Sequence, residues 1–466
     1  MRPSSSPSEP SAASGGGLFG GVLARGRVAA EVSDAAWLRA MLDVEAALAR
    51  AQARAGLLSD ADAGAIAAAA ADPGRFDADA IGAEAARSGN PVVPLVKALT
   101  DAVEGPAAGR VHAGATSQDV LDSAAMLVAQ RALGPLLDDL DAAADAAAAL
   151  AEEHATTVMA GRTLLQQALP VTFGLKAATW LTGLDEAAAR LHEVRRTRLA
   201  VQFGGAAGTL ASTGEAGPEV LAHLADELGL AEPVLPWHTI RTRPADLAGA
   251  LGAAAGVIAK AGRDVVVLAQ TEVGEVREGV PGRGGSSTLP HKRNPVAAIS
   301  AVAAAMRAPG LVATLLGAMA HEHERAAGPW HAEWRPFSDL LETVGSAAAW
   351  LRDCLEHLEV DGARMRANLG LTHGALLAER VTTALAGDLG RHAAHEVVQA
   401  AAREAFASNR PLADVLAATE EVSARLDPAE IARLLDPAGY LGATDELIRR
   451  ALRAHRAHRE RGARAL

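Results

Sequence analysis

Long apolar registers with few helix-breaking residues constrain the fold of this chain more than any other feature. Between residues 243 and 277, apolar side chains recur in a seven-residue register at Leu247, Leu251, Ala254, Ile258, Ala261, Val265 and Leu268. Similar stretches run over residues 133–154, 170–199, 296–316 and 335–358. Because their seams are rich in alanine, they predict close-packed, nearly parallel helices in a bundle.

The composition agrees with a helical chain that is too long for one compact core. Aromatic residues make up only 3% of the 466 residues, and β-branched runs are few, so we expect an all-α protein. Its segments predict a helical N-terminal domain at residues 18–111, a central long-helix bundle at 112–360 and a C-terminal helical domain at 361–466. Residues 1–17, rich in Ser, Pro and Gly, predict a disordered tail rather than a signal peptide.

Charge and cysteine content argue against several classes of partner. The net charge is −12, from 44 basic and 56 acidic residues, which argues against binding to nucleic acid or to anionic membranes. No apolar run reaches the roughly 18 residues needed to cross a bilayer, so we expect no membrane segment. The single cysteine, Cys354, excludes an internal disulfide and fits a reducing cytoplasm, where it would fill core space.

The sequence GGSSTLPHKRNP at residues 284–295 is the strongest candidate for chemistry. Two glycines loosen the backbone, Ser286 and Ser287 supply hydroxyls, and Lys292 supplies a cation. Asn294 followed by proline predicts the N-cap and first turn of a helix over the apolar run that follows. A flexible, hydroxyl-bearing, cationic loop before a helix N-terminus suits an enzyme that binds a carboxylate. An ordinary loop is the alternative for the glycine-serine part alone.

Two further segments carry hydrogen-bonding groups near predicted helix starts. Thr116 and Asp119 form a capping box, so free backbone N–H groups and the hydroxyls of Thr116 and Ser117 would face one point and make a carboxylate cradle. A capping box alone is usually structural. Thr163 and Gln166, in the sequence GRTLLQQALP, would offer neutral hydrogen bonds just before a helix that its proline would start.

The sequence HEHER at residues 321–325 raises the possibility of a metal site. Helical metal ligands are usually three or four residues apart, whereas His321 and His323 are two apart. We therefore expect no metal here.

Taken together, these segments resemble the fumarase/aspartase superfamily. The string GSSTLPHKRNP is similar to its signature loop, in the form found in the adenylosuccinate lyase and 3-carboxy-cis,cis-muconate cycloisomerase branch. The following strings resemble the same branch: HAGATSQD at 112–119, QFGGAAGTL at 202–210, PWHT at 236–239, HER at 323–325, WHAEW at 330–334 and DPAGYLG at 436–442. The resemblance covers nearly the whole chain, from residue 18 to residue 447.

The resemblance implies a role for each matching residue. Ser286, on a mobile lid, would be the residue that transfers the proton. Lys292 and Asn294 would hold the carboxylate whose aci form carries the developing negative charge. His112 would assist catalysis. The residues implied to bind substrate are Asn90, Thr116, Ser117, Thr163, Gln166, Asn294 and Arg325. A homotetramer formed through the bundles is also implied, with each active site assembled from three subunits, a small-molecule polycarboxylate as substrate and no cofactor.

Two departures from the family pattern leave the substrate open. Much of the superfamily has a histidine general acid where Leu164 stands, and the cycloisomerase branch typically has tryptophan there. Leucine cannot donate a proton, which argues against an amine or purine leaving group and favours one that departs unassisted, such as a carboxylate. In addition, Ile240-Arg241-Thr242 stands where the branch usually has Gln-Arg-Asp.

The resemblance favours conversion of 3-carboxy-cis,cis-muconate to 4-carboxymuconolactone by a cytoplasmic enzyme. Three alternatives stay open. One is nitrosuccinate lyase, because nitrite also leaves without an acid. The others are a reaction like that of adenylosuccinate lyase and a non-catalytic scaffold, as in the lens crystallins of this superfamily. The intact set of Ser286, Lys292 and Asn294 argues against the scaffold.

Overall fold

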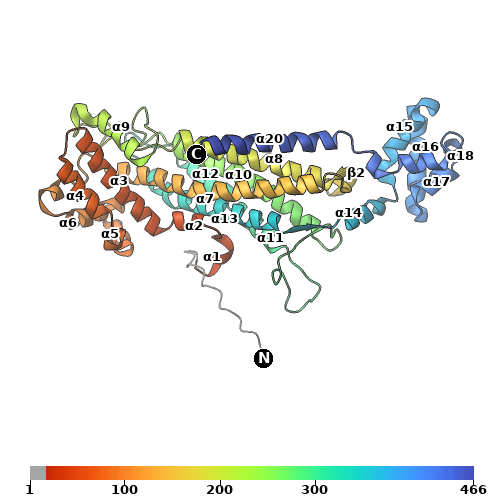
Figure 1. The fold of residues 1–466 in the computed structure, drawn as a ribbon, viewed down its shortest axis with the longest axis horizontal. Coiled ribbons are helices and arrows are strands. Elements are labelled where there is room, and N and C mark those ends of the chain that lie inside the picture. The colour runs from red at the N-terminus through yellow and green to blue at the C-terminus, as the bar shows by residue number, and fades with distance from the viewer. Residues whose placement is uncertain (1–16, 466) are drawn as a thin grey trace. The chain divides into compact units, whose positions relative to one another are not determined.

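The computed structural model describes residues 17–465 and is mostly helical, which confirms the predicted all-α class (Figure 1). The tail predicted at residues 1–17 lies outside the described residues except for Gly17, which begins helix α1 (Gly17–Leu23). Four short strands in the described chain form two antiparallel pairs. Strand β1 (Val158–Thr163) pairs with β2 (Gln166–Thr172), and β3 (Val276–Glu278) pairs with β4 (Leu358–Val360).

The described chain separates into two compact units, each built from three segments. The first contains the described residues up to 141 together with residues 186–259 and 300–351. The second contains residues 142–185, 260–299 and the described residues from 352 onward. The domain boundaries placed at residues 111 and 360 stay predictions.

Short helices occupy the N-terminal part of the first unit, close to where the sequence predicts them. They are α3 (Asp34–Arg54), α4 (Asp60–Ala70), α5 (Ala78–Ser88) and α6 (Val92–Ala102), with α9 (Gly217–Leu228) packed against α3. The Ser33 hydroxyl caps α3 by accepting a hydrogen bond from the Ala36 amide. One face of α3 is almost fully buried, so packing rather than propensity stabilises this helix.

The predicted long helices are present, with some changed boundaries. They are α7 (Ser117–Glu153), α8 (Phe173–Thr197), α10 (Thr242–Leu268) and α13 (Pro329–Glu356), while α11 (Val296–Ala305) and α12 (Ala308–Gly317) divide the fifth stretch. The α10 register is confirmed, because all seven of its predicted core side chains are buried. However, α10 ends at Leu268 rather than near residue 277. Gly274 has a φ of +63° and turns the chain into β3.

The prediction that Pro170 starts a helix is wrong. Pro170 lies in β2 opposite Ala160. A two-stranded sheet tolerates proline because each strand has one edge without a partner strand. Helix α8 begins three residues later, where the Thr172 hydroxyl accepts a hydrogen bond from the Leu175 amide at 3.1 Å.

Two helical stretches in the described chain, Ser117–Glu153 and Val296–Gly317, are long and apolar enough to cross a membrane by length and composition. The sequence prediction concerned an uninterrupted apolar run, whereas this criterion averages hydropathy over 18 residues and allows up to two charged side chains, so it does not overturn that prediction. The criterion is weak evidence, because buried core helices also meet it, and 72% of the first window is buried. Only 39% of the second window is buried, and it leaves Ile299, Met306 and Leu316 exposed.

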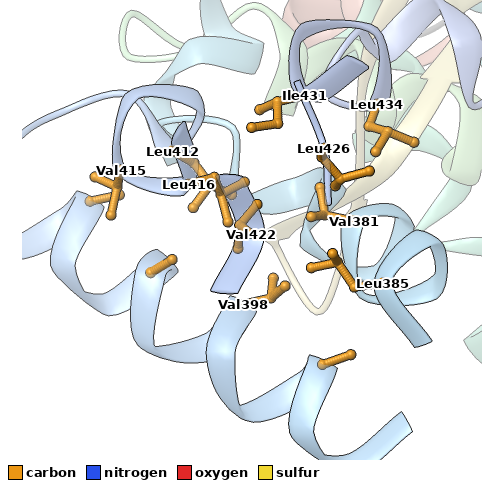
Figure 2. Packing of buried hydrophobic residues seen from close by; sticks show 13 residues of the cluster. Val381, Leu385, Val398, Leu412, Val415, Leu416, Val422, Leu426, Ile431 and Leu434 are labelled. Atoms are coloured by element: carbon orange, nitrogen blue, oxygen red, sulfur yellow. The ribbon is translucent and has the colours of Figure 1, made fainter. Parts of the chain in front are cut away.

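The second unit has its own hydrophobic core near the C-terminus (Figure 2). Side chains of α15 (Ala378–Leu389) and α16 (Arg391–Ser408) pack there with those of α17 (Leu412–Ala418) and α19 (Pro428–Leu434). Cys354 in α13 is also fully buried, as predicted, and burial raises the pKa of its thiol well above the ordinary value.

The last helix of the second unit, α20 (Thr444–Ala465), contacts the part of α8 that belongs to the same unit. His455 bridges two carboxylates there, with Nδ1 at 2.9 Å from Asp185 and Nε2 at 3.0 Å from Asp145. The hydrogen bond to Asp185, together with the charges of both aspartates, outweighs burial and raises the pKa of His455.

Candidate active site

The residues predicted to form the site fall into two sets, one in each unit. The set in the first unit is Asn90, His112, Thr116, Ser117 and Arg325. The set in the second unit is Thr163, Gln166, Ser286, Lys292 and Asn294.

The predicted cradle lies at the start of α7. Thr116 precedes the helix, and the Asp119 carboxylate accepts a hydrogen bond from the Thr116 amide at 3.0 Å, so the predicted helix start is confirmed. Within residues 17–465, the hydroxyls of Thr116 and Ser117 have no hydrogen-bond partner. These hydroxyls and the N-terminus of α7 together suit an anionic ligand.

Asp119 does far more than cap α7. Its Oδ1 accepts hydrogen bonds from the Gly204 amide at 3.0 Å and from His238 Nε2 at 2.6 Å, and its Oδ2 accepts from the Gly205 amide at 2.9 Å as well as from Thr116. The carboxylate is 2% exposed. It therefore joins three segments that are far apart in the sequence, a role that the capping-box pattern did not reveal.

His112 stands beside a buried carboxylate. Its backbone has a φ of +61°, and its Nδ1 lies 2.7 Å from Oε1 of Glu45, which is 1% exposed. Burial alone would lower the pKa of His112, but the hydrogen bond and charge of Glu45, with the charge of Asp119, raise it above the ordinary value. His112 therefore keeps its positive charge to a higher pH than an ordinary histidine would, next to the cradle.

Arg325 is half-buried and anchored at one nitrogen. Its Nη2 donates to the Gly205 carbonyl oxygen at 2.5 Å. Partial burial lowers the pKa of Arg325, with the charges of Asp119 and Asp122 opposing that shift, and the guanidinium keeps its charge. The cation therefore lies against the same glycine whose amide Asp119 binds.

Asn90, predicted to bind substrate, also has hydrogen-bond partners within the protein. Its Oδ1 accepts hydrogen bonds from the amides of Val92 at 3.0 Å and Val93 at 3.4 Å, so it caps α6. Its role in substrate binding stays a prediction.

A buried ionic network fixes helix α7 at Asp122, about one turn after the cradle. Arg241 donates to both oxygens of Asp122 at 2.8 and 3.0 Å, and to both oxygens of Glu333 at distances down to 2.5 Å. Burial would lower the pKa of Arg241, but the Asp122 charge and the Glu333 hydrogen bonds raise it instead. Trp330 donates its indole N–H to Asp122 at 3.0 Å. The family-like segments contain Arg241, Trp330 and Glu333 but do not reveal that these residues form one network, and Ile240, next to Arg241, is 65% exposed.

His321 ends this network and is not placed like a metal ligand paired with His323. Its side chain is fully buried and its Nε2 lies 3.3 Å from Oε1 of Glu333, without hydrogen-bond geometry at either ring nitrogen. His323 is exposed, with a φ of +48°. Within the described residues there is no cluster of three or more His, Cys, Asp or Glu side chains that could hold a metal ion.

In the second unit, Thr163 and Gln166 flank the tip of the β1–β2 hairpin. They pair across the turn, and the two residues between them, Leu164 and Leu165, have φ values of 51° and 65°. Leucine rarely adopts this left-handed conformation, which costs on the order of 1–2 kcal/mol per residue. Leu164 is 97% exposed and Leu165 77% exposed, so the turn presents apolar side chains where a histidine would present a proton donor.

An ion pair next to the tip of this hairpin fixes strand β1. Arg162 donates two hydrogen bonds to Glu275, at 2.7 and 2.9 Å, and Asn368 donates a third at 2.8 Å. Glu275 is fully buried, and this bidentate geometry holds the β1 strand in place up to its exposed tip.

The loop at residues 284–294 is closed at its base and exposed beyond it. The Asn294 amide and side-chain nitrogen both donate to the Gly284 carbonyl oxygen, at 2.8 and 3.1 Å. Ser286 Oγ accepts hydrogen bonds from the amides of Thr288 at 3.3 Å and Leu289 at 3.0 Å. Two N–H groups aimed at this oxygen stabilise negative charge on it, as a proton carrier requires.

The prediction that Asn294 caps the following helix is wrong. The Glu278 carboxylate, from β3, accepts hydrogen bonds from the first amides of α11, those of Ala297 at 3.1 Å and Ala298 at 2.9 Å. A carboxylate satisfies two amides at once and complements the positive end of the helix dipole, so it displaces an asparagine cap. Asn294 is thereby released to tie the loop base to Gly284.

Comparison with known proteins covers most of the chain. A lyase family model matches residues 24–310, and a model of the adenylosuccinate lyase C-terminus matches residues 374–451. The chain is 50% identical to 3-carboxy-cis,cis-muconate cycloisomerase of Pseudomonas aeruginosa, covering 94% of this chain and 96% of that protein. It is 47% identical to nitrosuccinate lyase of Streptomyces davaonensis, covering 94% of each chain.

A solved structure shows the same fold. The 3-carboxy-cis,cis-muconate lactonizing enzyme of Pseudomonas putida superposes with a TM-score of 0.89 at 43% identity, covering 95% of this chain and 99% of that chain. The protein therefore belongs to the lyase family of the fumarase/aspartase superfamily, as its signature loop predicts. Within that superfamily it is similar to the bacterial cycloisomerases.

Proposed function

We propose that this enzyme is a cycloisomerase that converts 3-carboxy-cis,cis-muconate to 4-carboxymuconolactone. The observation that carries the proposal is the likeness to cycloisomerases along almost the entire chain, in sequence and in fold. The reaction is an isomerisation: one substrate carboxylate adds to a double bond, forming a C–O bond. The adjacent carbon becomes a carbanion and then takes a proton.

Ser286 is the proposed proton carrier. Its hydroxyl gives its proton to the carbanion, forming the C–H bond, and the remaining oxygen is stabilised by the amides of Thr288 and Leu289. The same contacts let Ser286 act as a base in the reverse direction. Lys292 and Asn294, from the same loop, would hold the carboxylate that takes the aci form beside the carbanion.

Substrate binding would fall to the cradle and the hairpin. Thr116 and Ser117 offer unpaired hydroxyls at a helix N-terminus, Arg325 offers a cation, and His112 is biased toward its cationic form by Glu45. Asn90, Thr163 and Gln166 would complete the set with neutral hydrogen bonds. The substrate carries three carboxylates, so each of these hydrogen-bonding and cationic groups would have a carboxylate oxygen to bind.

Leu164 supports a leaving group that needs no acid. In the direction of lactone opening the group that departs is a carboxylate, whose reference pKa lies near 4. An exposed leucine at the hairpin tip supplies no proton, and none is needed.

We also propose that the active enzyme is a cytoplasmic homotetramer without a cofactor, with each site shared between subunits. The exposed apolar residues of α11 and α12, and the exposed leucines of the hairpin tip, support association because a monomer leaves them in water. The single buried cysteine fits a reducing compartment.

Nitrosuccinate lyase is the second candidate, because a relative of nearly equal identity carries that name and because nitrite also leaves without an acid. In that reaction Ser286 would remove a proton, nitrite would leave and fumarate would form. A reaction like that of adenylosuccinate lyase would need a donor where Leu164 stands, and a scaffold would not need Ser286.

Comparison of kcat/KM for the two substrates on the same purified enzyme tests the proposal. Loss of the conjugated-diene absorbance of 3-carboxy-cis,cis-muconate reports the first reaction, and release of nitrite with formation of fumarate reports the second. The proposal predicts a much larger kcat/KM for the muconate. A larger value for nitrosuccinate would replace it with the second candidate.

A further inference from the structure

We propose that Asp119 and His238 form a buried positioning pair that sets the shape of the cradle made by Thr116, Ser117 and Arg325. The pair would not touch substrate. It would act by holding the backbone and the cation that do. The kinetic part of its test rests on the proposed function, and the structural part does not.

The Asp119 carboxylate has every acceptor position filled. An ionised carboxylate offers about four lone-pair sites. Here they receive the amides of Thr116, Gly204 and Gly205 and the imidazole of His238, at 3.0, 3.0, 2.9 and 2.6 Å. At 2% exposure no water replaces a lost partner easily, so each donor depends on this carboxylate.

The donors come from both sides of the cradle. The Thr116 amide belongs to the hydroxyl side of the cradle, just before α7. The Gly205 amide binds Asp119, while the Gly205 carbonyl oxygen accepts from Arg325 at 2.5 Å. Asp119 thus fixes the position of Gly205, and Gly205 fixes the guanidinium. A shift of the carboxylate would move the hydroxyl side and the cationic side of the cradle together.

His238 completes the pair because it is fixed at two points to the same turn of α7. Its Nε2 donates to Asp119, and its backbone carbonyl oxygen accepts from Gln118 at 2.9 Å. Its ring packs directly on Gly204, where an added Cβ would come within 2.8 Å of the ring carbon Cε1. This contact holds the ring with Nε2 toward the carboxylate, and an ionised Asp119 is satisfied there only by a donor.

The substitution Asp119→Asn tests the pair. Whichever way the new amide turns, its NH2 group faces at least one backbone N–H that had an acceptor. We expect KM for 3-carboxy-cis,cis-muconate to rise about 100-fold while kcat changes much less, because the binding geometry is displaced and Ser286 is not. Asp138→Asn, the same change on an exposed position of α7, is the matched control and should leave both constants unchanged.

Hydrogen exchange measured by mass spectrometry gives a readout that does not need activity. In Asp119→Asn, peptides containing Thr116 and Gly204–Gly205 should exchange faster while peptides elsewhere in the first unit keep wild-type rates. His238→Gln keeps a hydrogen-bond donor opposite Asp119 and should therefore retain most of the wild-type KM and exchange pattern. His238→Leu has no donor and should resemble Asp119→Asn.

Unchanged exchange and KM in Asp119→Asn would overturn the inference, as would faster exchange spread evenly over the first unit. The latter would show a general structural role. If the wild-type enzyme does not consume the muconate, the proposed function fails, and the exchange pattern alone decides on the pair.

Discussion

The cradle around Thr116 and the loop at residues 284–294 are both needed in the proposed reaction, yet they are held in opposite ways. Asp119, 2% exposed, accepts one hydrogen bond within the cradle and three from two other segments. In contrast, the loop is tied at its base between Gly284 and Asn294, and beyond that base Ser286 is half-buried and Lys292 is exposed.

The difference separates binding from chemistry. A cradle fixed by buried hydrogen bonds is already organised for carboxylates, so little ordering remains when substrate binds. A loop with few buried contacts opens and closes at small cost, which suits a segment that must admit substrate and then exclude water. Substitutions in the two regions should therefore fail in different ways.

The largest expected effect is on proton transfer. Ser286→Ala removes the proposed carrier, and we expect kcat to fall about 10⁴-fold, at the upper end of what a proton-transfer group contributes, with the melting temperature unchanged. Loss of diene absorbance measures the rate. Ser287→Ala, one residue along the same loop, is the matched control and should retain near-wild-type activity. Equal losses in both variants would show that the loop matters only through its shape.

The next largest effect is on the free energy of unfolding, through the buried ionic network around Arg241. Arg241→Met leaves the buried carboxylates of Asp122 and Glu333 without their cation, and we expect the free energy of unfolding to fall by about 4 kcal/mol. Urea unfolding followed by circular dichroism measures this change. Arg335→Met, at an arginine whose side chain is 83% exposed, should change the free energy by less than about 0.5 kcal/mol. Similar losses for both would contradict the assignment of Arg241 as the buried anchor.

A smaller effect should follow from disturbing the loop base. Gly284 has a φ of +75°, and an added Cβ would lie 2.2 Å from the Asn294 carbonyl oxygen, whereas Gly285 has open space around it. We expect Gly284→Ala to lower kcat about 10- to 100-fold without a comparable loss of stability. Gly285→Ala should change kcat only slightly. Steady-state kinetics compare the two alanine variants directly. Equal kcat values would show that the loop base between Gly284 and Asn294 has no special role in catalysis.

The smallest effect is a shift in pH dependence within the cradle. Because the pKa of His112 is raised, its cation persists above the ordinary value of 6.5, and kcat/KM should fall as pH rises through the raised pKa. Glu45→Gln removes the hydrogen-bonded charge that raises the pKa of His112 most, so burial, which lowers it, is then opposed only by the charge of Asp119. The fall should therefore move to lower pH.

A matched histidine provides the control for that shift. His455→Gln removes another histidine of raised pKa, in α20, and should leave the kcat/KM profile in place. A profile of kcat/KM against pH for wild type and both variants makes the comparison. A fall that stays at the wild-type pH in Glu45→Gln would exclude His112 as the titrating group.

Sequence patterns predicted the regions of this molecule where local rules dominate. The α10 register gave its buried face because a seven-residue apolar repeat specifies which side of a helix packs. The start of α7 followed from its capping box. The predicted site residues in the cradle and the loop could be located by motif, while their joint action stays a prediction.

Contacts between distant segments account for what the sequence did not reveal. Glu278 replaced Asn294 as the cap of α11 because β3 brings a carboxylate to that helix end. Pro170 entered a strand because its pairing with Ala160 outweighs the helix-starting preference of proline. The Asp119–His238 contact joins residues 119 positions apart, and no local pattern encodes it.

Hydrogen exchange of the wild-type enzyme, with and without saturating 3-carboxy-cis,cis-muconate under turnover, tests the separation of binding from chemistry most directly. We predict that amides of residues 286–292 exchange rapidly in the free enzyme and slow when ligand is present. Amides of Thr116, Gly204 and Gly205 should be slow in both states. Slow exchange of the loop without ligand, or rapid exchange of the cradle amides, would contradict the account.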